Sequence, residues 1–316
     1  MAEFRTVIKP IQHKNSIDYN SKILLLGSCF TEHISEKLSY FKFKQVTNPF
    51  GILFNSSAIK TALKHCVNNT VYTENDLKFY NELWFSLNHH TCFSSSDSRT
   101  TLEAINSKIT ATHSFIKEVT HIIITLGTAW VYTHNESQII VGNCHKLPQK
   151  KFNKSLQNID AITNDLSTIR ATIQSINPNC TILYTVSPVR HLRDGFTENS
   201  MSKAHLISAI QTHIKATENT YYVPAYELML DDLRDYRFYT DDMLHPNNAA
   251  INYIWNYFKE SWISEKTYTL MKEIENLQKA LNHRPFNTDT ETYKKFKSTL
   301  DKKIALFSKK NPTISF

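Results

Sequence analysis

Glycine is scarce in this sequence: there are five in 316 residues, where about 7% is usual. A chain this poor in glycine is expected to keep it where a side chain would be hard to place. Such places are positive φ angles and close approaches of two backbone segments. The five positions therefore point to special backbone: Gly27, Gly51, Gly127, Gly142 and Gly195.

Cysteine pairs and long apolar runs are also missing. The five cysteines are odd in number, widely spaced and without a CxxC pair, which favours a reduced compartment over a disulfide framework or a zinc ribbon. No run approaches the roughly 18 apolar residues that a membrane span needs. Residues 1–16 lack the apolar segment of a secretory signal. We expect a cytoplasmic protein with no membrane span.

The remaining composition is that of an ordinary globular protein, with 41% hydrophobic and 21% charged residues, which excludes a disordered or collagen-like chain. The net charge of +7 is placed unevenly, because the segment from Glu265 to the end holds 11 Lys+Arg and 6 Asp+Glu. We interpret this basic segment as a solvated helical face. The alternative is an arm for an anionic partner. It has no nucleic-acid-binding motif, so we expect no nucleic acid partner.

Strands and helices alternate along the chain. Short apolar strands are predicted at 21–26, 121–126 and 181–186, and a small hairpin at 132–141. The clearest helix runs from Leu156 to Ile176, with apolar residues every three or four positions. This order predicts an α/β fold with a parallel sheet flanked by helices. We place a core domain at 1–264 and a basic helical extension at 265–316.

Polar side chains and glycines gather where the carboxyl ends of the strands should lie, the edge at which such sheets bind ligands. Gly27-Ser28-Cys29 follows the first strand, and a hydroxyl or thiol there gains from the N-terminus of the next helix. Asp242 precedes His245 by three residues, and this pair can supply a base with its orienting partner. The N–H groups of Cys29 and Gly51 are candidates for an oxyanion pocket.

Taken together, seven stretches resemble the bacterial GSCFA family, which belongs to the SGNH/GDSL-like hydrolases. They are LLLGSCFTEHI, NPFGI, TLGTAWVY, GNCHKLPQKKF, TVSPVRH, ENSMSKA and TDDMLHPN. The resemblance covers roughly residues 20 to 260. It implies a three-layer, flavodoxin-like SGNH-hydrolase fold around a central parallel sheet.

Two blocks depart from the superfamily pattern. The first block usually reads Gly-Asp-Ser, but here Cys29 occupies the place of the serine nucleophile. The register favours Cys29, while the chemical habit of the superfamily keeps Ser28 as a candidate. The third block usually reads Gly-x-Asn-Asp, but here it begins Gly127-Thr128 and its amide donor is missing. Thr128 is the only nearby side-chain replacement, and losing one such donor typically costs ~10²–10³ in rate.

Other polar residues at the strand ends are candidates for substrate binding: Asn48, Asn143, His145, Arg190 and Lys203. Arg190 can instead pair with Asp194. We interpret Asn199 as a helix cap.

The adjacent histidines His89 and His90 raise the question of a metal site. Neighbours in a strand point to opposite faces and no HExxH helix accompanies them, so we expect surface histidines and no metal. No cofactor is expected.

The hypothesis is a hydrolase of ester or thioester bonds whose substrate is a small acyl ester or an acylated carbohydrate. Cys29 or Ser28 attacks, His245 takes the proton and Asp242 holds the imidazole. An acyltransferase acting on a carbohydrate or lipid shares this chemistry up to the acyl-enzyme. A catalytically silent binding module is the second alternative, because the amide donor is missing. The oligomeric state stays open.

Overall fold

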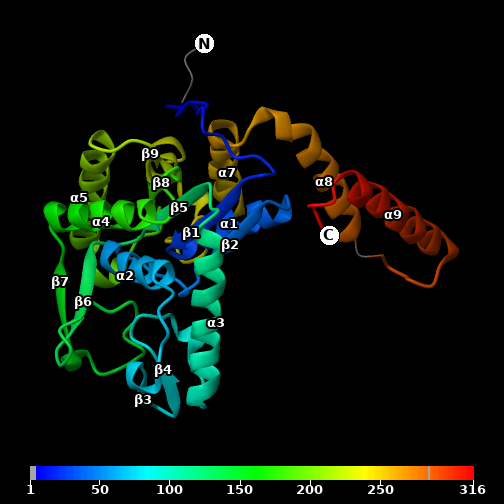
Figure 1. Cartoon of the computed structure of the whole chain (residues 1–316). Helices are drawn as coiled ribbons and strands as arrows, with labels where there is room; N and C mark the ends of the chain where they lie inside the picture. The colour runs from blue at the N-terminus through cyan, green and yellow to red at the C-terminus, as the bar shows by residue number, and fades with distance from the viewer. Residues whose placement is uncertain (1–4, 284) are drawn as a thin grey trace.

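The computed structural model describes residues 5–283 and 285–316. At its centre lies a sheet of five parallel strands, in the order β2-β1-β5-β8-β9 (Figure 1). The strands are β1 (Lys22–Gly27), β2 (Lys44–Thr47), β5 (His121–Leu126), β8 (Thr181–Val186) and β9 (Thr220–Val223). Counted along the chain this is the order 2-1-3-4-5, which is the flavodoxin-like arrangement. The predicted α/β architecture is confirmed.

Helices cover both faces of the sheet. They are α1 (Cys29–Tyr40), α2 (Ser56–Val67), α3 (Ser98–Ile116), α4 (Ile159–Gln174), α5 (Phe196–Lys215), α6 (Ala225–Glu227) and α7 (Asn248–Trp262). Side chains alternate between the faces of a strand. Leu24 and Ile122 therefore pack with α2 to α5 on one face, whereas Ile23 and Ile123 pack with α1 and α7 on the other. The result is three layers with an apolar core on each side of the sheet.

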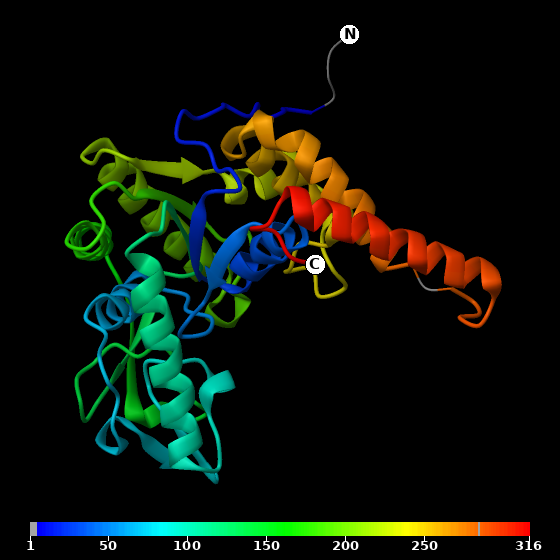
Figure 2. The same ribbon diagram turned by 45° about the vertical axis from the view of Figure 1, so that its right-hand side comes forward.

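Two insertions form a separate lobe at one end of the molecule (Figure 1, Figure 2). The hairpin β3 (Lys78–Tyr80) and β4 (Leu83–Phe85) lies between α2 and α3, and β6 (Trp130–His134) with β7 (Phe152–Leu156) lies between β5 and α4. We call residues 70–97 and 130–156 the insertion lobe. Phe85, Leu87 and Val141 give it a small core of its own.

The hairpin predicted at 132–141 is only partly right. Thr133 and Ile140 form an isolated bridge, but the ladder of β6 is made with β7. The sequence pattern predicted the turn but not the pairing of β6 with β7, which lies further along the chain.

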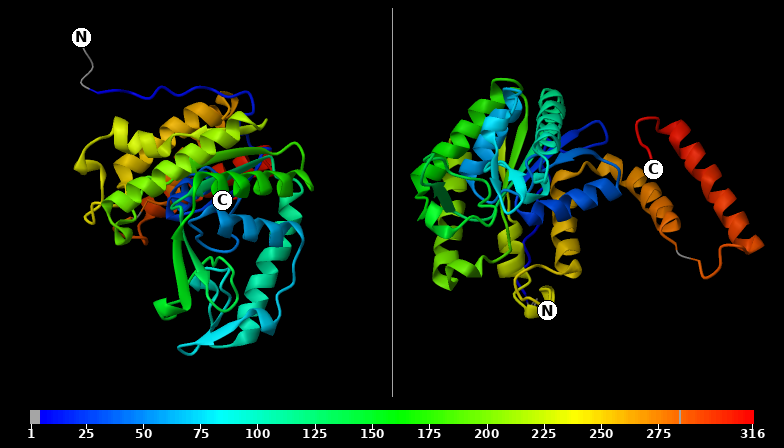
Figure 3. Two further views of the ribbon diagram at one scale, coloured as in Figure 1. Left: turned by 90° about the vertical axis from the view of Figure 1, so that its left-hand side faces the viewer. Right: turned by 90° about the horizontal axis from the view of Figure 1, so that it is seen from below.

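The C-terminal residues form a helical hairpin, α8 (Tyr268–Leu281) and α9 (Glu291–Lys310), which projects to one side (Figure 1, Figure 3). Gln278 anchors it by donating to the Tyr40 carbonyl at 2.9 Å, and Met271 enters the core beside α1 and α7. The predicted helical extension is confirmed. Among the described residues, no helix combines the length and apolar character that crossing a membrane requires.

Candidate active site

A tight turn joins β1 to α1 and fixes the position of Cys29. Gly27 has a φ of 135°, and a Cβ at this position would lie 2.1 Å from the carbonyl oxygen of Thr125 on the neighbouring strand. The next amide, that of Ser28, donates to the same oxygen at 3.1 Å. Only glycine fits where the backbone crosses β5 this closely. The turn places Cys29 at the first position of α1.

The two candidate nucleophiles differ in accessibility. The side chain of Ser28 is fully buried, and its Oγ has no hydrogen-bond partner among the described residues. Cys29 is partly exposed. Burial raises the pKa of the Cys29 thiol and the charge on Glu32 raises it further, while backbone N–H groups of Phe30 and Cys29 and the charge on Lys203 lower it. Cys29 is thus the candidate that a substrate can reach.

Asp242 and His245 form a hydrogen-bonded pair on the loop before α7. His245 Nδ1 lies 2.6 Å from Asp242 Oδ2. Asp242 Oδ1 accepts the N–H groups of His245 and Leu244 at 3.0 and 2.9 Å and the Thr240 hydroxyl at 2.7 Å. These bonds lower the pKa of Asp242, so the carboxylate is charged at neutral pH. It orients the imidazole and leaves Nε2 as the nitrogen that can take a proton.

His191 interacts through charge with His245 and with Lys203, and Lys203 in turn acts on Cys29. Burial, together with charges on Lys203 and His245, lowers the pKa of His191 to about 4 against the opposing charge of Asp194. The charge on Lys203 also acts on Cys29. A Cβ at Gly127 would lie 3.3 Å from His191 Nε2, which places the imidazole against the end of β5. These groups are therefore electrostatic neighbours at the carboxyl edge of the sheet.

Lys203 is enclosed at this edge. Its side chain is only 1% exposed, and Nζ donates to the carbonyls of Gly127 at 2.7 Å and Ser187 at 2.8 Å. Burial lowers the pKa of Lys203 to about 7. The predicted substrate-binding side chain thus binds the protein's own backbone and ties together the ends of β5 and β8.

Apart from the Cys29 N–H, the backbone amides of the candidate oxyanion residues Gly51, Gly127 and Thr128 already have partners. The Gly51 N–H donates to the Asn48 carbonyl at 2.7 Å, and those of Gly127 and Thr128 donate to the Phe54 carbonyl at 2.7 and 3.1 Å. The Thr128 hydroxyl lies 3.1 Å from the Ser202 hydroxyl and accepts the Trp130 N–H at 3.1 Å.

The side-chain amide of Asn48 uses its oxygen in a hydrogen bond but not its nitrogen, as far as the described residues go. Its Oδ1 accepts the Gly27 N–H at 2.9 Å. Its Nδ2 is buried and, within the described part of the chain, has no partner. This amide is an unengaged donor held beside the turn that carries Cys29.

Asn143 and His145 lie in the insertion lobe. The Asn143 N–H donates to the Leu87 carbonyl at 3.1 Å. His145 Nε2 lies 2.9 Å from the Ser86 carbonyl, its ring stacks on Phe85, and burial lowers its pKa to about 4. Both residues join the two insertions, and over the described residues neither hydrogen-bonds to Cys29, Asp242 or His245.

Arg190 is close enough to two tyrosines to act on them through charge: it lowers the pKa of Tyr226 and of Tyr239, which burial raises. The alternative pairing with Asp194 is not formed, because Asp194 pairs with Lys154.

Asn199 does not cap a helix, because α5 begins at Phe196 with Gly195 as its N-cap. Its Oδ1 instead accepts the His191 N–H at 2.9 Å. The sequence pattern predicted neither this contact of Asn199 nor the buried position of His191. Their signal was their place in the stretches ENSMSKA and TVSPVRH.

His89 is not a surface residue, contrary to expectation. It is 1% exposed and stacks on Phe50 with ring centroids 4.0 Å apart, because the 86–93 loop folds beneath the turn that contains Phe50. Neither ring nitrogen has a partner in the described ranges. No group of three His, Cys, Asp or Glu side chains is placed to hold a metal in the part of the chain that the structure describes.

The fold and the site define a three-layer α/β protein of the flavodoxin-like class, with candidate groups at the edge where such folds bind ligands. The chain belongs to the GSCFA family, whose model matches residues 22–258. A second model, described as the C-terminal domain of GSCFA domain proteins, matches residues 274–316. The resemblance drawn from the sequence is confirmed.

Several solved structures are similar to this chain. A family 3 carbohydrate esterase of Clostridium thermocellum is 10% identical, with a TM-score of 0.37 over 81% of this chain and 98% of its own. A family 3 carbohydrate esterase of Talaromyces cellulolyticus is 10% identical, with a TM-score of 0.36 over 80% of this chain and 99% of its own. An acetyl xylan esterase of Butyrivibrio proteoclasticus is 9% identical, with a TM-score of 0.38 over 77% of this chain and 64% of its own. Comparison with curated protein sequences gives no match.

Proposed function

We propose that the protein hydrolyses ester or thioester bonds through an acyl-enzyme formed on Cys29. One observation carries the proposal: the Asp242–His245 pair and the partly exposed Cys29 thiol lie at the same edge of the sheet. A thiol is activated by an adjacent base when that base is oriented by a third group. The N-terminus of α1 further favours a thiolate at its first residue.

The reaction follows from these roles. His245 Nε2 takes the thiol proton as Cys29 Sγ forms a bond to the acyl carbon. The carbon–oxygen or carbon–sulfur bond to the leaving group breaks, and the imidazolium returns the proton to that group. Water then adds to the acyl-enzyme while His245 takes one of its protons, the carbon–sulfur bond breaks, and the departing thiolate recovers a proton from the imidazolium. Asp242 stabilises the imidazolium in both halves.

The oxyanion formed in each half needs donors at the carboxyl edge. We assign this role to Asn48 Nδ2 and to the Cys29 N–H, since the first amides of a helix have no partner within the helix and Asn48 Nδ2 has none among the described residues. Two donors of this kind supply the stabilisation that acyl transfer needs. Asn48 then replaces the amide that is missing from the third block.

The proposed substrate is a small acyl ester or an acylated carbohydrate. Arg190, with Tyr226 and Tyr239 beside it, offers a charged and aromatic surface that can bind a polar alcohol portion. Transfer of the acyl group to a carbohydrate or lipid hydroxyl would use the same acyl-enzyme and differ only in the acceptor.

A catalytically silent binding module is a second candidate. Burial raises the pKa of Cys29, and the amides of Gly51 and Gly127 are already bonded. Such a module would bind acyl compounds without turnover.

Mass spectrometry of the intact protein tests the proposal. Wild type, Ser28→Ala and Cys29→Ala are incubated with p-nitrophenyl acetate and an acetyl thioester, and each is analysed for an acetyl adduct. We expect the adduct in wild type and Ser28→Ala and its absence in Cys29→Ala. An adduct that disappears only in Ser28→Ala would make the serine the nucleophile. Binding without adduct or turnover in any form would support the binding module.

A further inference from the structure

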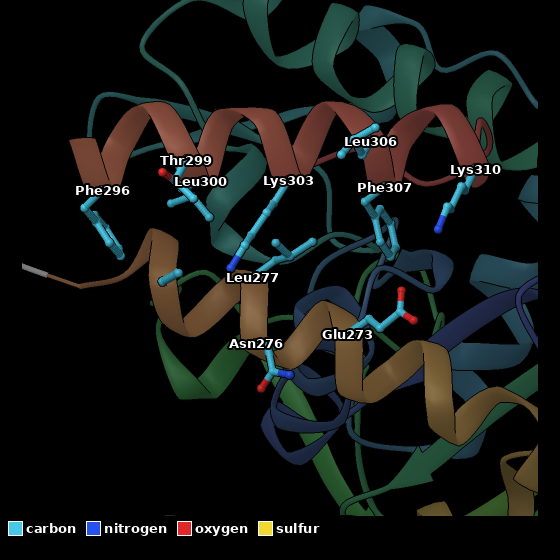
Figure 4. Close-up of a pocket in the computed structure, with 11 residues that line it drawn as sticks. Glu273, Asn276, Leu277, Phe296, Thr299, Leu300, Lys303, Leu306, Phe307 and Lys310 are labelled. Atoms are coloured by element: carbon cyan, nitrogen blue, oxygen red, sulfur yellow. The ribbon is translucent and has the colours of Figure 1, made fainter. Parts of the chain in front are cut away.

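A groove of about 390 Å³ opens between α8 and α9, away from the candidate active site (Figure 4). Its apolar lining comes from both helices: Leu277, Ala280, Phe296, Leu300, Leu306 and Phe307. Figure 4 shows Lys303, Phe307 and Lys310 extending from α9 towards α8. We propose that this groove binds an acidic amphipathic helix of a partner protein.

The shape of the groove suits a helix. Two helices that lie side by side leave a trough along their length, into which a third helix can place a row of apolar side chains. The lining residues of α9 run from Phe296 to Lys310, about 21 Å at 1.5 Å per residue. A helix of about 14 residues matches this length and would present apolar residues at a spacing of three and four.

The charge of the groove selects an acidic occupant. Helix α9 carries seven lysines against Glu291 and Asp301. Lys303 and Lys310 line the groove, and within the described residues neither has a carboxylate within 4 Å. The facing helix contributes Glu273 and Asn276. A partner helix that is acidic along the flank facing α9 therefore meets unpaired ammonium groups.

Other occupants fit this surface less well. A second copy would bring another basic helix against the first, and like charges repel. An anionic membrane surface is bound by a helix whose whole apolar face is turned outward, whereas α9 exposes only Phe296 and Leu306 of its apolar groove residues and keeps Leu300 and Phe307 as the floor of the groove against α8. Leu306 is the apolar groove residue of α9 with the largest exposure, at 62%.

The proposal is independent of the proposed function. None of the residues that line the groove belongs to the candidate active site, and a separate family model matches the hairpin. Failure of the esterase test would therefore leave the docking proposal untouched, and the reverse also holds.

A displayed library of amphipathic helices of about 16 residues tests the proposal against the full chain. The apolar register is fixed and the flanking positions vary among Glu, Gln and Lys. We expect enriched clones to carry glutamate along one flank. The double variant Lys303→Glu/Lys310→Glu should weaken their binding at least about tenfold.

The matched control is Lys295→Glu/Lys297→Glu, which makes the same charge change on exposed lysines of α9 that do not line the groove. Its binding should stay within about threefold of wild type, and circular dichroism checks that all variants are folded. Absence of enriched clones, enrichment of neutral or basic flanks, or equal weakening by both double variants would overturn the proposal. If no clones are enriched, Lys303-dependent sedimentation on anionic phospholipid vesicles would identify a membrane as the occupant, and a concentration-dependent dimer would identify a second copy.

Discussion

The Oδ1 of Asn48 accepts the N–H of Gly27 at 2.9 Å, which leaves the amide nitrogen of Asn48 without a partner among residues 5–283 and 285–316. Asn48→Asp keeps the acceptor for Gly27 and removes the donor. We expect the kcat for p-nitrophenyl acetate to fall by about 10²–10³ with little change in KM. Steady-state kinetics measures this, and an unaltered kcat would remove Asn48 from the oxyanion role.

Asp242 orients His245, so Asp242→Asn should leave the fold intact and lower kcat by about 10²–10⁴. The reason is that an amide can stabilise the wrong tautomer of the imidazole and cannot stabilise its charged form. Asp241→Asn is the matched control, since the exposed Asp241 is the neighbouring carboxylate. If the two variants lose activity equally, the pair does not act as proposed.

Lys203 and Cys29 are coupled through charge. The ammonium lowers the pKa of the thiol, but burial lowers the pKa of Lys203 to about 7, so this charge acts only at lower pH. Lys203→Met should therefore shift the acidic side of the Cys29 alkylation profile, below about pH 7, to higher pH and leave the profile above about pH 8 unchanged. Peptide-level mass spectrometry with iodoacetamide at a series of pH values measures the shift. The exposed Cys92 serves as a reference in the same molecule, and a profile that moves equally for both cysteines would contradict this coupling.

His89 makes folding sensitive to acid. Burial, together with the charges of His65 and His145, lowers the pKa of His89 from 6.5 to about 3. Between these two pH values the unfolded chain binds a proton that the folded protein does not, so the free energy of unfolding falls as the pH falls. The slope is about 1.4 kcal/mol per pH unit for one histidine.

His89→Phe keeps the stacking on Phe50 and removes the titrating group. Urea unfolding between pH 6.5 and 4 should show a slope lower by about one proton than in wild type. At pH 7 we expect a gain of about 1–3 kcal/mol, because two unpaired buried nitrogens are removed. An unchanged slope would show that His89 does not stay neutral in the folded protein.

The central strands could be predicted because they are buried on both faces. Strands β5 and β8 are buried along their whole length, and a parallel strand in this position is a continuous apolar run. Strand β2, with the sequence KQVT, lies at the edge of the sheet and is only half buried. It therefore lacks the pattern that identified the others. Helix α9 could be predicted only as part of a basic helical extension, without its bounds, since only Leu300 and Phe307 are buried among its lysines.

The candidate site divides in the same way. Cys29, Asp242 and His245 stand in short motifs whose chemistry is local, so the sequence was enough to name them. The free donor of Asn48 depends on a partner 21 residues away, and the burial of Lys203 depends on the Gly127 carbonyl, 76 residues away. Such states are set by tertiary contacts, and a linear pattern of residue types does not encode them.

The insertion lobe contacts the sheet-edge turns and shares only part of their core, since Tyr72 and Leu77 belong to the same apolar cluster as Phe50. The His90 N–H donates to the Phe50 carbonyl at 2.8 Å, whereas Phe85, Leu87 and Val141 pack among themselves. The two hairpins of the insertion lobe are thus separate from the turn that carries Cys29 and the loop that carries Asp242. Lengthening or shortening either hairpin would alter what approaches the sheet edge and leave Cys29 and Asp242 in place. Selectivity and chemistry can therefore diversify at separate rates within one chain.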